Sequence, residues 1–263
     1  MKDIWSEKTE VRFGCVDRSD RLTLGSIFSF FQEAAISHAA DLGVGRDVMA
    51  EMHQAWVLCR LSVFVERRPS YGEAIEIKSW PRNWEKLMAY RDYEIRDAND
   101  VPVVRGRGSW LVLDMEKRRP LRAQPFMSAM PLNDGIDAFP SGPAVLASRE
   151  NLAKVMERNA LYSDIDFYGH ANNARYIQWI QDATDIDILT GAEQYRLDIN
   201  YLNEVMPSET VELWNALIET AIPHENRNDY PASPGKNFAY EGRRPGSSNL
   251  NQQIVFRAEL QTG

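Results

Sequence analysis

The chain contains few of the residues that bind metals or form disulfides. Its 263 residues include two cysteines, Cys15 and Cys59, and four histidines, at positions 38, 53, 170 and 224. Both cysteines lie on predicted strands, which fits buried thiols better than a disulfide, and no spacing typical of zinc ligands occurs. We therefore expect a cytoplasmic protein without a metal site.

Long apolar runs and phosphate-binding loops are missing as well. No run reaches 18 apolar residues and the first residues form no apolar signal region, so we expect no membrane span. The sequence has neither a phosphate-cradling glycine loop nor a dinucleotide fingerprint, and we expect no cofactor. With 38 acidic and 30 basic residues, the net charge of −8 argues against nucleic acid as the main partner.

An acidic partner would have to meet a local cluster of basic residues. The candidates are Lys117-Arg118-Arg119 with Arg122, the pair Arg67-Arg68, and the pair Arg243-Arg244. A solvated edge or loop would carry the same charges, so these clusters alone leave both interpretations open.

The most informative segment spans residues 164–183. It places Asp166, His170 and two asparagines just ahead of residues that have the apolar spacing of a helix. Asn172 or Asn173 can cap this helix, and His170 then lies beside the positive end of the helix dipole, which stabilises oxyanions. This combination suggests attack on a carbonyl, although a turn with a helix cap would use the same residues.

An internal repeat relates this segment to the first third of the chain. Phe31-Gln32-Glu33-Ala34 aligns with Ile180-Gln181-Asp182-Ala183 at an offset of 149 residues, which places Asp17 on Asp166 and Arg21 on His170. Further on, Gly72-Glu73-Ala-Ile-Glu-Ile77 matches Ser208-Glu209-Thr-Val-Glu-Leu213 at an offset of 136. Two matches in the same order indicate a duplicated domain, whose first copy has arginine in place of the histidine.

Each copy is predicted to hold a long helix followed by antiparallel strands, an α+β pattern. In the first copy, helical spacing runs over residues 24–42, and strand alternation over 56–65 places Val57, Cys59, Leu61, Val63 and Val65 on one face. Further strands are expected at 74–80, 88–96 and 103–113. The second copy is expected to have a helix over 173–189, strands over 195–201, 210–219, 238–243 and 252–260, and an extended loop over 223–236.

A segment without periodicity separates the two copies. Residues 120–143 contain five prolines, which indicates a linker wrapped over the surface, and residues 144–159 are expected to include a short helix. We place the N-terminal domain at residues 1–122, the proline-rich linker at 123–153 and the C-terminal domain at 154–263.

These segments resemble the acyl-acyl carrier protein (acyl-ACP) thioesterases, the family of the plant chain-terminating enzymes and their bacterial relatives. The resemblance covers nearly the whole chain. Its motifs in the first copy are Leu24-Gly25-x6-Gln32-Glu33-Ala34-Ala35, Trp56-Val57-Leu58-x-Arg60, Glu66-Arg67-x-Pro69-x-x-Gly72-Glu73, Trp80-Pro81, Ser109-Trp110 and Arg118-Arg119-Pro120. In the second copy they are Asp166-x-x-x-His170-x-Asn172-Asn173-x-x-Tyr176 and Asn200-Tyr201-Leu202-x-Glu204.

The resemblance implies an α+β fold of two tandem hotdog domains, each a long helix wrapped by an antiparallel sheet. It implies hydrolysis of the thioester between a fatty acyl chain and the phosphopantetheine arm of acyl carrier protein, which terminates chain elongation. The C-terminal domain would be catalytic and the N-terminal domain would shape the acyl pocket. A fused pair of this kind can be a monomer or a homodimer.

The family's motif Asp-x-Asn-x-His falls on Asp166, Tyr168 and His170, so tyrosine replaces the asparagine. The family's later acid falls on Glu204, and the next position, a cysteine in plant members, is Val205. Without that cysteine we expect water to attack, with Glu204 as its base or orienting group and His170 polarising the carbonyl or sharing proton transfer. Asp166 would orient His170 or help to hold the water. Tyr168 is a further catalytic candidate, although a packed aromatic with a satisfied hydroxyl is the preferred interpretation.

Substrate contacts are expected at both ends of the acyl chain. Asn172 and Asn173 would cap the second helix and contact the substrate. The acyl pocket would lie under the first helix and be lined by the apolar residues Ile27, Phe28, Phe31, Val57, Cys59 and Trp110. Ordinary core packing would also bury most of these side chains. An acyl-CoA thioesterase and a non-catalytic acyl-binding protein remain open alternatives.

Overall fold

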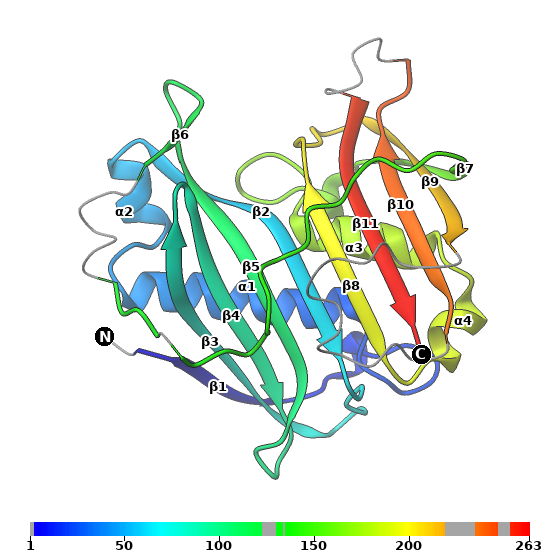
Figure 1. Ribbon diagram of the computed structural model, residues 1–263, viewed down its shortest axis with the longest axis horizontal. Helices are drawn as coiled ribbons and strands as arrows, with labels where there is room; N and C mark the ends of the chain where they lie inside the picture. Colours follow the sequence, from blue (N-terminus) through cyan, green and yellow to red (C-terminus); the bar gives the residue numbers. More distant parts are fainter. Residues whose placement is uncertain (1–2, 123–129, 134, 219–234, 247–252) are drawn as a thin grey trace.

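The computed structural model describes residues 3–122, 130–133, 135–218, 235–246 and 253–263. Within these residues, eleven strands form one antiparallel sheet in the order β1-β3-β4-β5-β2-β8-β11-β10-β9-β7, with β6 paired to β5 (Figure 1). The first half of the chain contributes β1 (Trp5–Glu10), β2 (Gln54–Val65), β3 (Ala74–Glu85), β4 (Met88–Arg96), β5 (Pro102–Asp114) and β6 (Arg119–Leu121). The second half contributes β7 (Ala153–Asn159), β8 (Tyr195–Tyr201), β9 (Thr210–Ile218), β10 (Asn237–Arg243) and β11 (Ile254–Thr262).

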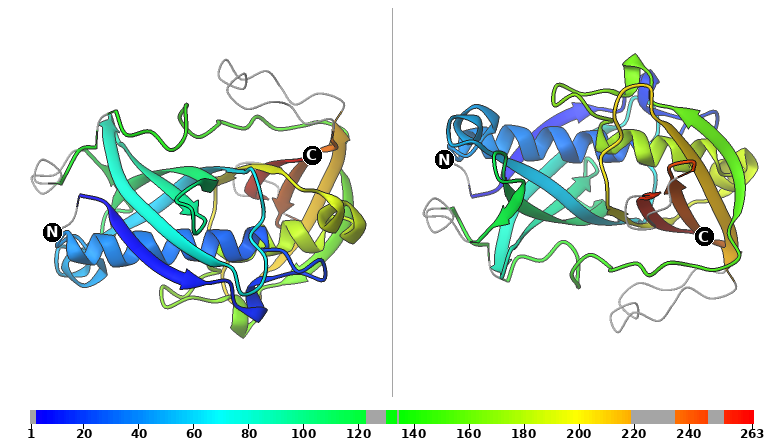
Figure 2. Two further views of the ribbon diagram at one scale, coloured as in Figure 1. Left: turned by 90° about the horizontal axis from the view of Figure 1, so that it is seen from below. Right: turned by 90° about the horizontal axis from the view of Figure 1, so that it is seen from above.

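The helices cover one face of this sheet (Figure 2). They are α1 (Leu24–Asp41) and α2 (Arg46–Glu51) in the first half, and α3 (Asn173–Asp182) and α4 (Ile186–Gly191) in the second. Each half is therefore a long helix against an antiparallel sheet, and the predicted α+β fold with two hotdog units is confirmed.

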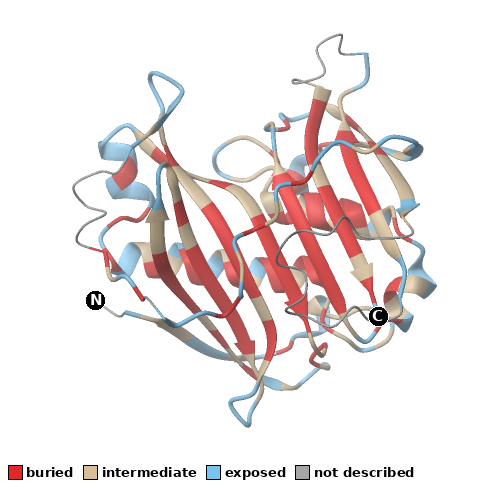
Figure 3. Ribbon diagram, in the orientation of Figure 1, coloured by how far each residue is buried: buried red, intermediate tan, exposed pale blue. Residues whose placement is uncertain are grey.

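The two halves share one continuous sheet. β2 pairs with β8 from Arg60 opposite Asn200 to Val65 opposite Tyr195. On the helical face α1 contacts α3, where the Gln181 side chain accepts a hydrogen bond from the backbone N–H of Gly25 at 2.9 Å. The interior between the helices and the sheet is buried across this seam (Figure 3). The halves therefore form a single packed body.

Helix α1 forms where its apolar spacing predicts. The Thr23 hydroxyl accepts a hydrogen bond from the N–H of Ser26 at 3.1 Å and so caps its first turn. Ile27, Phe28 and Phe31 then point into the core and are at most 3% exposed. Burying side chains of this size stabilises the fold by about 1.5–3 kcal/mol each, so the apolar stripe of α1 holds it on the sheet.

The internal repeat extends to single backbone hydrogen bonds. In each half, a short 3-10 helix (Phe13–Cys15 or Tyr162–Asp164) precedes a turn, a helix cap and the long helix. Equivalent bonds run from Asp17 N to Arg21 O (2.9 Å) and from Asp166 N to His170 O (3.0 Å), and from Leu22 N to Pro69 O (2.8 Å) and from Ala171 N to Val205 O (2.8 Å). The bonded residues of the two halves are separated by the same offsets of 149 and 136 residues that the sequence repeat shows. Both halves therefore fold this loop in the same way.

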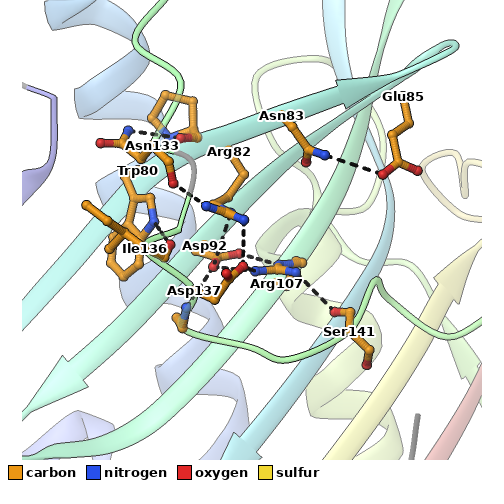
Figure 4. Close-up of polar contacts among 12 residues, drawn as sticks. Trp80, Arg82, Asn83, Glu85, Asp92, Arg107, Asn133, Ile136, Asp137 and Ser141 are labelled. Atoms are coloured by element: carbon orange, nitrogen blue, oxygen red, sulfur yellow. Dashed lines mark hydrogen bonds and ion pairs between the residues drawn. The ribbon is translucent and has the colours of Figure 1, made fainter.

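Residues 135–152 cross the sheet on the face opposite the helices (Figure 2). Buried charges of the first half hold them there (Figure 4). Asp92 is fully buried and accepts hydrogen bonds from Arg107 Nε at 2.5 Å and from the backbone N–H of Ala138 at 2.8 Å. Asp137 lies 2.6 Å from guanidinium nitrogens of both Arg82 and Arg107.

The second half holds the same segment through Asn200. Its side-chain nitrogen donates to the Ala144 carbonyl at 2.8 Å, and its oxygen accepts from the Leu146 N–H at 2.9 Å. Residues 135–152 are therefore fastened to both halves of the sheet.

Several predicted elements differ in the structure. Residues 144–159 contain no helix, and residues 153–159 instead form β7, which pairs with β9. Cys15 lies in a 3-10 helix rather than on a strand, and both cysteines are free thiols. The helix predicted over 173–189 is broken after Asp182, because the Asp185 side chain accepts from the Asp187 N–H at 2.8 Å and starts α4.

The expected loop at 223–236 falls mostly outside the described residues. None of the helices within the described residues has the length and apolar character needed to cross a bilayer.

Candidate active site

The loop before α3 carries the candidate acid and histidine in a tight turn. The Asp166 carboxylate accepts a hydrogen bond from the Tyr168 N–H at 2.9 Å, and its carbonyl accepts from the Gly169 N–H at 3.0 Å. Gly169 has a φ of 86°, a left-handed conformation that glycine adopts without strain. The turn places His170 Nδ1 at 4.0 Å from the Asp166 carboxylate, within ion-pair reach when the imidazole is protonated.

Tyr168 covers the histidine from outside. Its ring lies parallel to the His170 imidazole with 6.0 Å between the ring centres, and its side chain is half exposed. The ring of Tyr168 therefore packs against the neighbouring rings of Phe167 and His170, while about half of the side chain stays exposed. Partial burial raises the pKa of Tyr168 and Arg46 acts against this shift, so the phenol stays protonated near neutral pH.

The N-terminus of α3 begins directly after this turn. The Asn172 side chain accepts from the Ala174 N–H at 2.8 Å and caps the helix, as predicted for an asparagine here. Asn173 is the first helical residue, and its carbonyl accepts from the Tyr201 hydroxyl at 3.3 Å. Burial raises the pKa of Tyr201 far above its ordinary value, so this hydroxyl keeps its proton and donates.

Glu204 lies on a segment that is hydrogen-bonded to the same loop. The Ala171 N–H donates to the Val205 carbonyl at 2.8 Å, which sets the backbone next to His170 against the backbone next to Glu204. The Glu204 side chain is half exposed, while the following Val205 is fully buried. The backbone thus brings the predicted acid, histidine, helix start and Glu204 into one region.

The first half of the chain reaches this region with two arginines. Arg118, between β5 and β6, lies 3.7 Å from the Glu204 carboxylate. Arg46 of α2 lies over the Phe167 ring, 4.8 Å from its centre. The sequence placed Arg118 in a basic cluster but did not connect it with Glu204, and no local signal marked Arg46, because both contacts join residues far apart in the chain.

The residues predicted to line the acyl pocket are mostly core residues of the first half. Ile27, Phe28 and Phe31 are buried, and Trp110 is half-buried against the same core. Val57 and Cys59 are half-buried and lie outside the buried core cluster. The register of β2 against β5 shifts between Leu58 and Arg60, so Leu58 rather than Val57 is buried among the core residues.

The equivalent position in the first half lacks this chemistry. There, Asp17, Arg21 and Arg68 correspond to the acid, the histidine and Glu204 of the second half. Arg68 is buried and pairs with the Asp17 carboxylate at 2.6 Å, and its guanidinium lies 5.1 Å from the ring centre of Tyr195 in the other half. Because arginine remains protonated in proteins, neither Arg21 nor Arg68 can serve as a base.

Comparisons with known proteins show which family this sequence matches. Residues 2–129 match the model of the acyl-ACP thioesterase N-terminal domain, and residues 148–240 match that of the C-terminal domain. A chloroplastic acyl-[acyl-carrier-protein] hydrolase of Cuphea viscosissima, FATB2, is 25% identical over 74% of this chain and 50% of its own length. Oleoyl-acyl carrier protein thioesterase 1 of Arabidopsis thaliana is 24% identical over 79% of this chain and 62% of its own length. The chain therefore spans about half to three fifths of these relatives.

Solved structures share the fold over the full chain. An acyl-ACP thioesterase from Bacteroides thetaiotaomicron superposes with a TM-score of 0.78 at 23% identity, covering 99% of this chain and 98% of its own. The 12:0-ACP thioesterase of Umbellularia californica superposes with a TM-score of 0.79 at 17% identity, covering 99% and 94%. With both family domains matched in order along the sequence, the chain belongs to the acyl-ACP thioesterase family.

Proposed function

We propose that this protein hydrolyses the thioester of fatty acyl-ACP, releases the free fatty acid and so terminates chain elongation. The observation that supports this most directly is the Ala171–Val205 hydrogen bond, because it joins the loop of Asp166 and His170 to the segment of Glu204 at the start of α3. A base, a histidine and a helix N-terminus in one region are the groups that acyl transfer to water requires. Membership of the family provides independent support.

In the proposed reaction, Glu204 takes a proton from water while the water oxygen bonds to the thioester carbon. His170, oriented by Asp166, polarises the carbonyl. The N–H groups of Ala174 and Arg175 donate hydrogen bonds within the helix cap, to the Asn172 side chain and, at 2.8 Å, to the Asn172 carbonyl. The N–H of Asn173 is therefore our candidate oxyanion donor. The carbon–sulfur bond then breaks, and the thiolate recovers the proton from Glu204.

The carrier is proposed to be acyl carrier protein, whose acidic surface would meet basic residues around the site. Arg46 and Arg118 of the first half both contact this region, and Arg244 donates to the Glu204 carbonyl. These arginines offset the negative charge of the chain as a whole where the carrier would approach.

A thiol-release assay on acyl-ACPs of graded chain length tests the proposal. Acyl-CoAs with the same chains form the matched comparison. We expect a higher kcat/KM on acyl-ACP than on acyl-CoA of equal length. A higher kcat/KM on acyl-CoA would show that the carrier is coenzyme A rather than acyl carrier protein. Tight acyl-ACP binding without thiol release would show that the protein binds acyl chains without hydrolysing the thioester.

A further inference from the structure

Two tyrosines join α3 to the segment that carries Glu204. The hydroxyl of Tyr201, at the end of β8, donates a hydrogen bond to the Asn173 carbonyl in the first turn of α3 at 3.3 Å. In the opposite direction, the backbone N–H of Val205 donates to the hydroxyl oxygen of Tyr176, which lies about one turn further along α3. Each element therefore supplies a phenol that binds the backbone of the other.

The two phenol rings also pack against each other. Tyr176 and Tyr201 meet edge to face with 5.6 Å between ring centres, and Tyr176 belongs to the buried core against which Tyr201 packs. Burial raises the pKa of both phenols far above neutral pH, so both keep their protons and their hydrogen bonds there. The pair therefore forms a fixed contact between α3 and the end of β8.

These bonds fasten the backbone on both sides of Glu204. Val205 follows Glu204 directly and is fully buried, with its N–H bound to Tyr176 and its carbonyl accepting from the Ala171 N–H at 2.8 Å. On the other side, Tyr201 lies three residues before Glu204. The candidate base therefore lies between two points at which its segment is tied to α3 and to the loop that precedes α3.

The first half of the chain folds the equivalent loop without phenols. The sequence offsets of 149 and 136 residues place Ile27 and Val65 at the two tyrosine positions, and both are buried core residues. Pro69 stands at the position of Val205 and has no N–H to donate. The fold therefore does not require either phenol hydrogen bond, and the tyrosines occur in the half that carries the candidate base.

We propose that Tyr176 and Tyr201 are positioning residues that fix the distance between the Glu204 carboxylate and the N-terminus of α3. This inference rests on the proposed thioesterase function. In the proposed reaction, the water held by Glu204 must reach a carbonyl carbon whose oxygen lies at the Asn173 N–H. A misplacement of about 1 Å between such groups can lower a rate by about 10²-fold, so this spacing has to be held by the surrounding structure.

The test removes one phenol hydroxyl at a time and compares it with a matched control at the other end of α3. The control is Tyr240→Phe, because the Tyr240 hydroxyl is buried and hydrogen-bonds to Thr184 Oγ1 at 2.7 Å just after the helix. Each of Tyr176→Phe, Tyr201→Phe and Tyr240→Phe loses one hydrogen bond and should lower the melting temperature by about 2–4 °C.

Turnover should separate the three variants that melting does not. In the thiol-release assay, Tyr176→Phe and Tyr201→Phe should each lower kcat by about tenfold and leave KM for acyl-ACP within about twofold of the wild type. Tyr240→Phe should keep the wild-type kcat. Wild-type kcat in either of the first two variants, or an equal loss in the control, overturns the inference.

A double-mutant cycle shows whether the effect of Tyr176 passes through Glu204. Glu204→Ala has no carboxylate to position, so adding Tyr176→Phe should lower its remaining kcat by less than about twofold. A further tenfold loss in that background would show a structural role and overturn the inference. If the wild type releases no thiol from any acyl-ACP, the proposed function fails and this inference with it, whereas wild-type release with unaffected phenylalanine variants overturns this inference alone.

Discussion

Glu204 and His170 are the two side chains whose removal tests the proposed chemistry most directly. A positioned general base supplies about 10²–10⁴-fold and one oxyanion-site donor about 10²–10³-fold. We expect Glu204→Ala and His170→Ala each to lower kcat by about two orders of magnitude in the thiol-release assay. The exposed Glu193→Ala is the matched control and should keep wild-type turnover. Near-normal kcat in both site variants would contradict the assignment.

Tyr168 stands where the family has asparagine, and its ring rather than its hydroxyl contacts His170. Aromatic stacking of this kind contributes about 1 kcal/mol, which corresponds to roughly fivefold in rate. Tyr168→Phe should therefore retain wild-type kcat/KM, and Tyr168→Ala should lower it about fivefold. A large loss in Tyr168→Phe would show that the phenol donates a hydrogen bond to the substrate or to water.

At the scale of elements, the chain offers two helix caps that differ in their proposed function. Asn172 caps α3 beside the candidate site, and Thr23 caps α1 at the equivalent place in the first half. Replacing either with alanine should lower the free energy of unfolding by about 1 kcal/mol in urea denaturation. Only Asn172→Ala should also lower kcat, by about tenfold, because it loosens the turn that presents the Asn173 N–H. Equal kcat values for Asn172→Ala and Thr23→Ala would show that the N-terminus of α3 takes no part in catalysis.

The elements with one clear apolar face could be predicted from sequence. Helix α1 and strand β4 begin where their apolar spacing predicts, because burial and periodicity agree there. Strands β1 and β7 were missed, since both lie at sheet edges, expose at least half of their residues and show no apolar alternation. The sheet face predicted for Val57 was wrong because β2 contains a bulge. A bulge depends on the pairing strand, which the sequence of one strand does not reveal.

At the scale of the whole molecule, the candidate site depends on contacts between the halves. Asp166 and His170 lie within one loop, so their proximity follows from five consecutive residues and a glycine turn. The approach of Arg118 to Glu204 depends instead on how the two halves of the sheet pair, and local sequence carries no signal for it. The repeat did indicate which half could hold a base, because the first half has arginine where the second has histidine.

The first half's equivalent site is an ion pair that also contacts the second half. Arg68 binds the Asp17 carboxylate, and its Nη2 donates to the Thr190 carbonyl at 3.4 Å. Arg68→Met should lower the free energy of unfolding by about 3 kcal/mol, because it strands a partly buried carboxylate and removes a contact across the halves. Turnover at a permissive temperature should stay near the wild-type value, since the candidate site lies in the other half. A loss of kcat without a loss of stability would contradict this role.

The same ion pair gives the whole molecule a defined sensitivity to acid. Burial raises the pKa of Asp17, but hydrogen bonds from Ser19 and the neighbouring Arg68 outweigh it, so the pKa lies below its ordinary value. A carboxyl group whose pKa is lowered by folding stabilises the protein above its unfolded pKa of about 4, and this contribution is lost as the pH falls through the folded value. The melting temperature of the wild type should therefore drop more steeply below pH 4 than that of Arg68→Met, as measured by thermal unfolding from pH 2.5 to 6. Parallel curves for the two proteins would mean that Asp17 and Arg68 do not stabilise each other in solution.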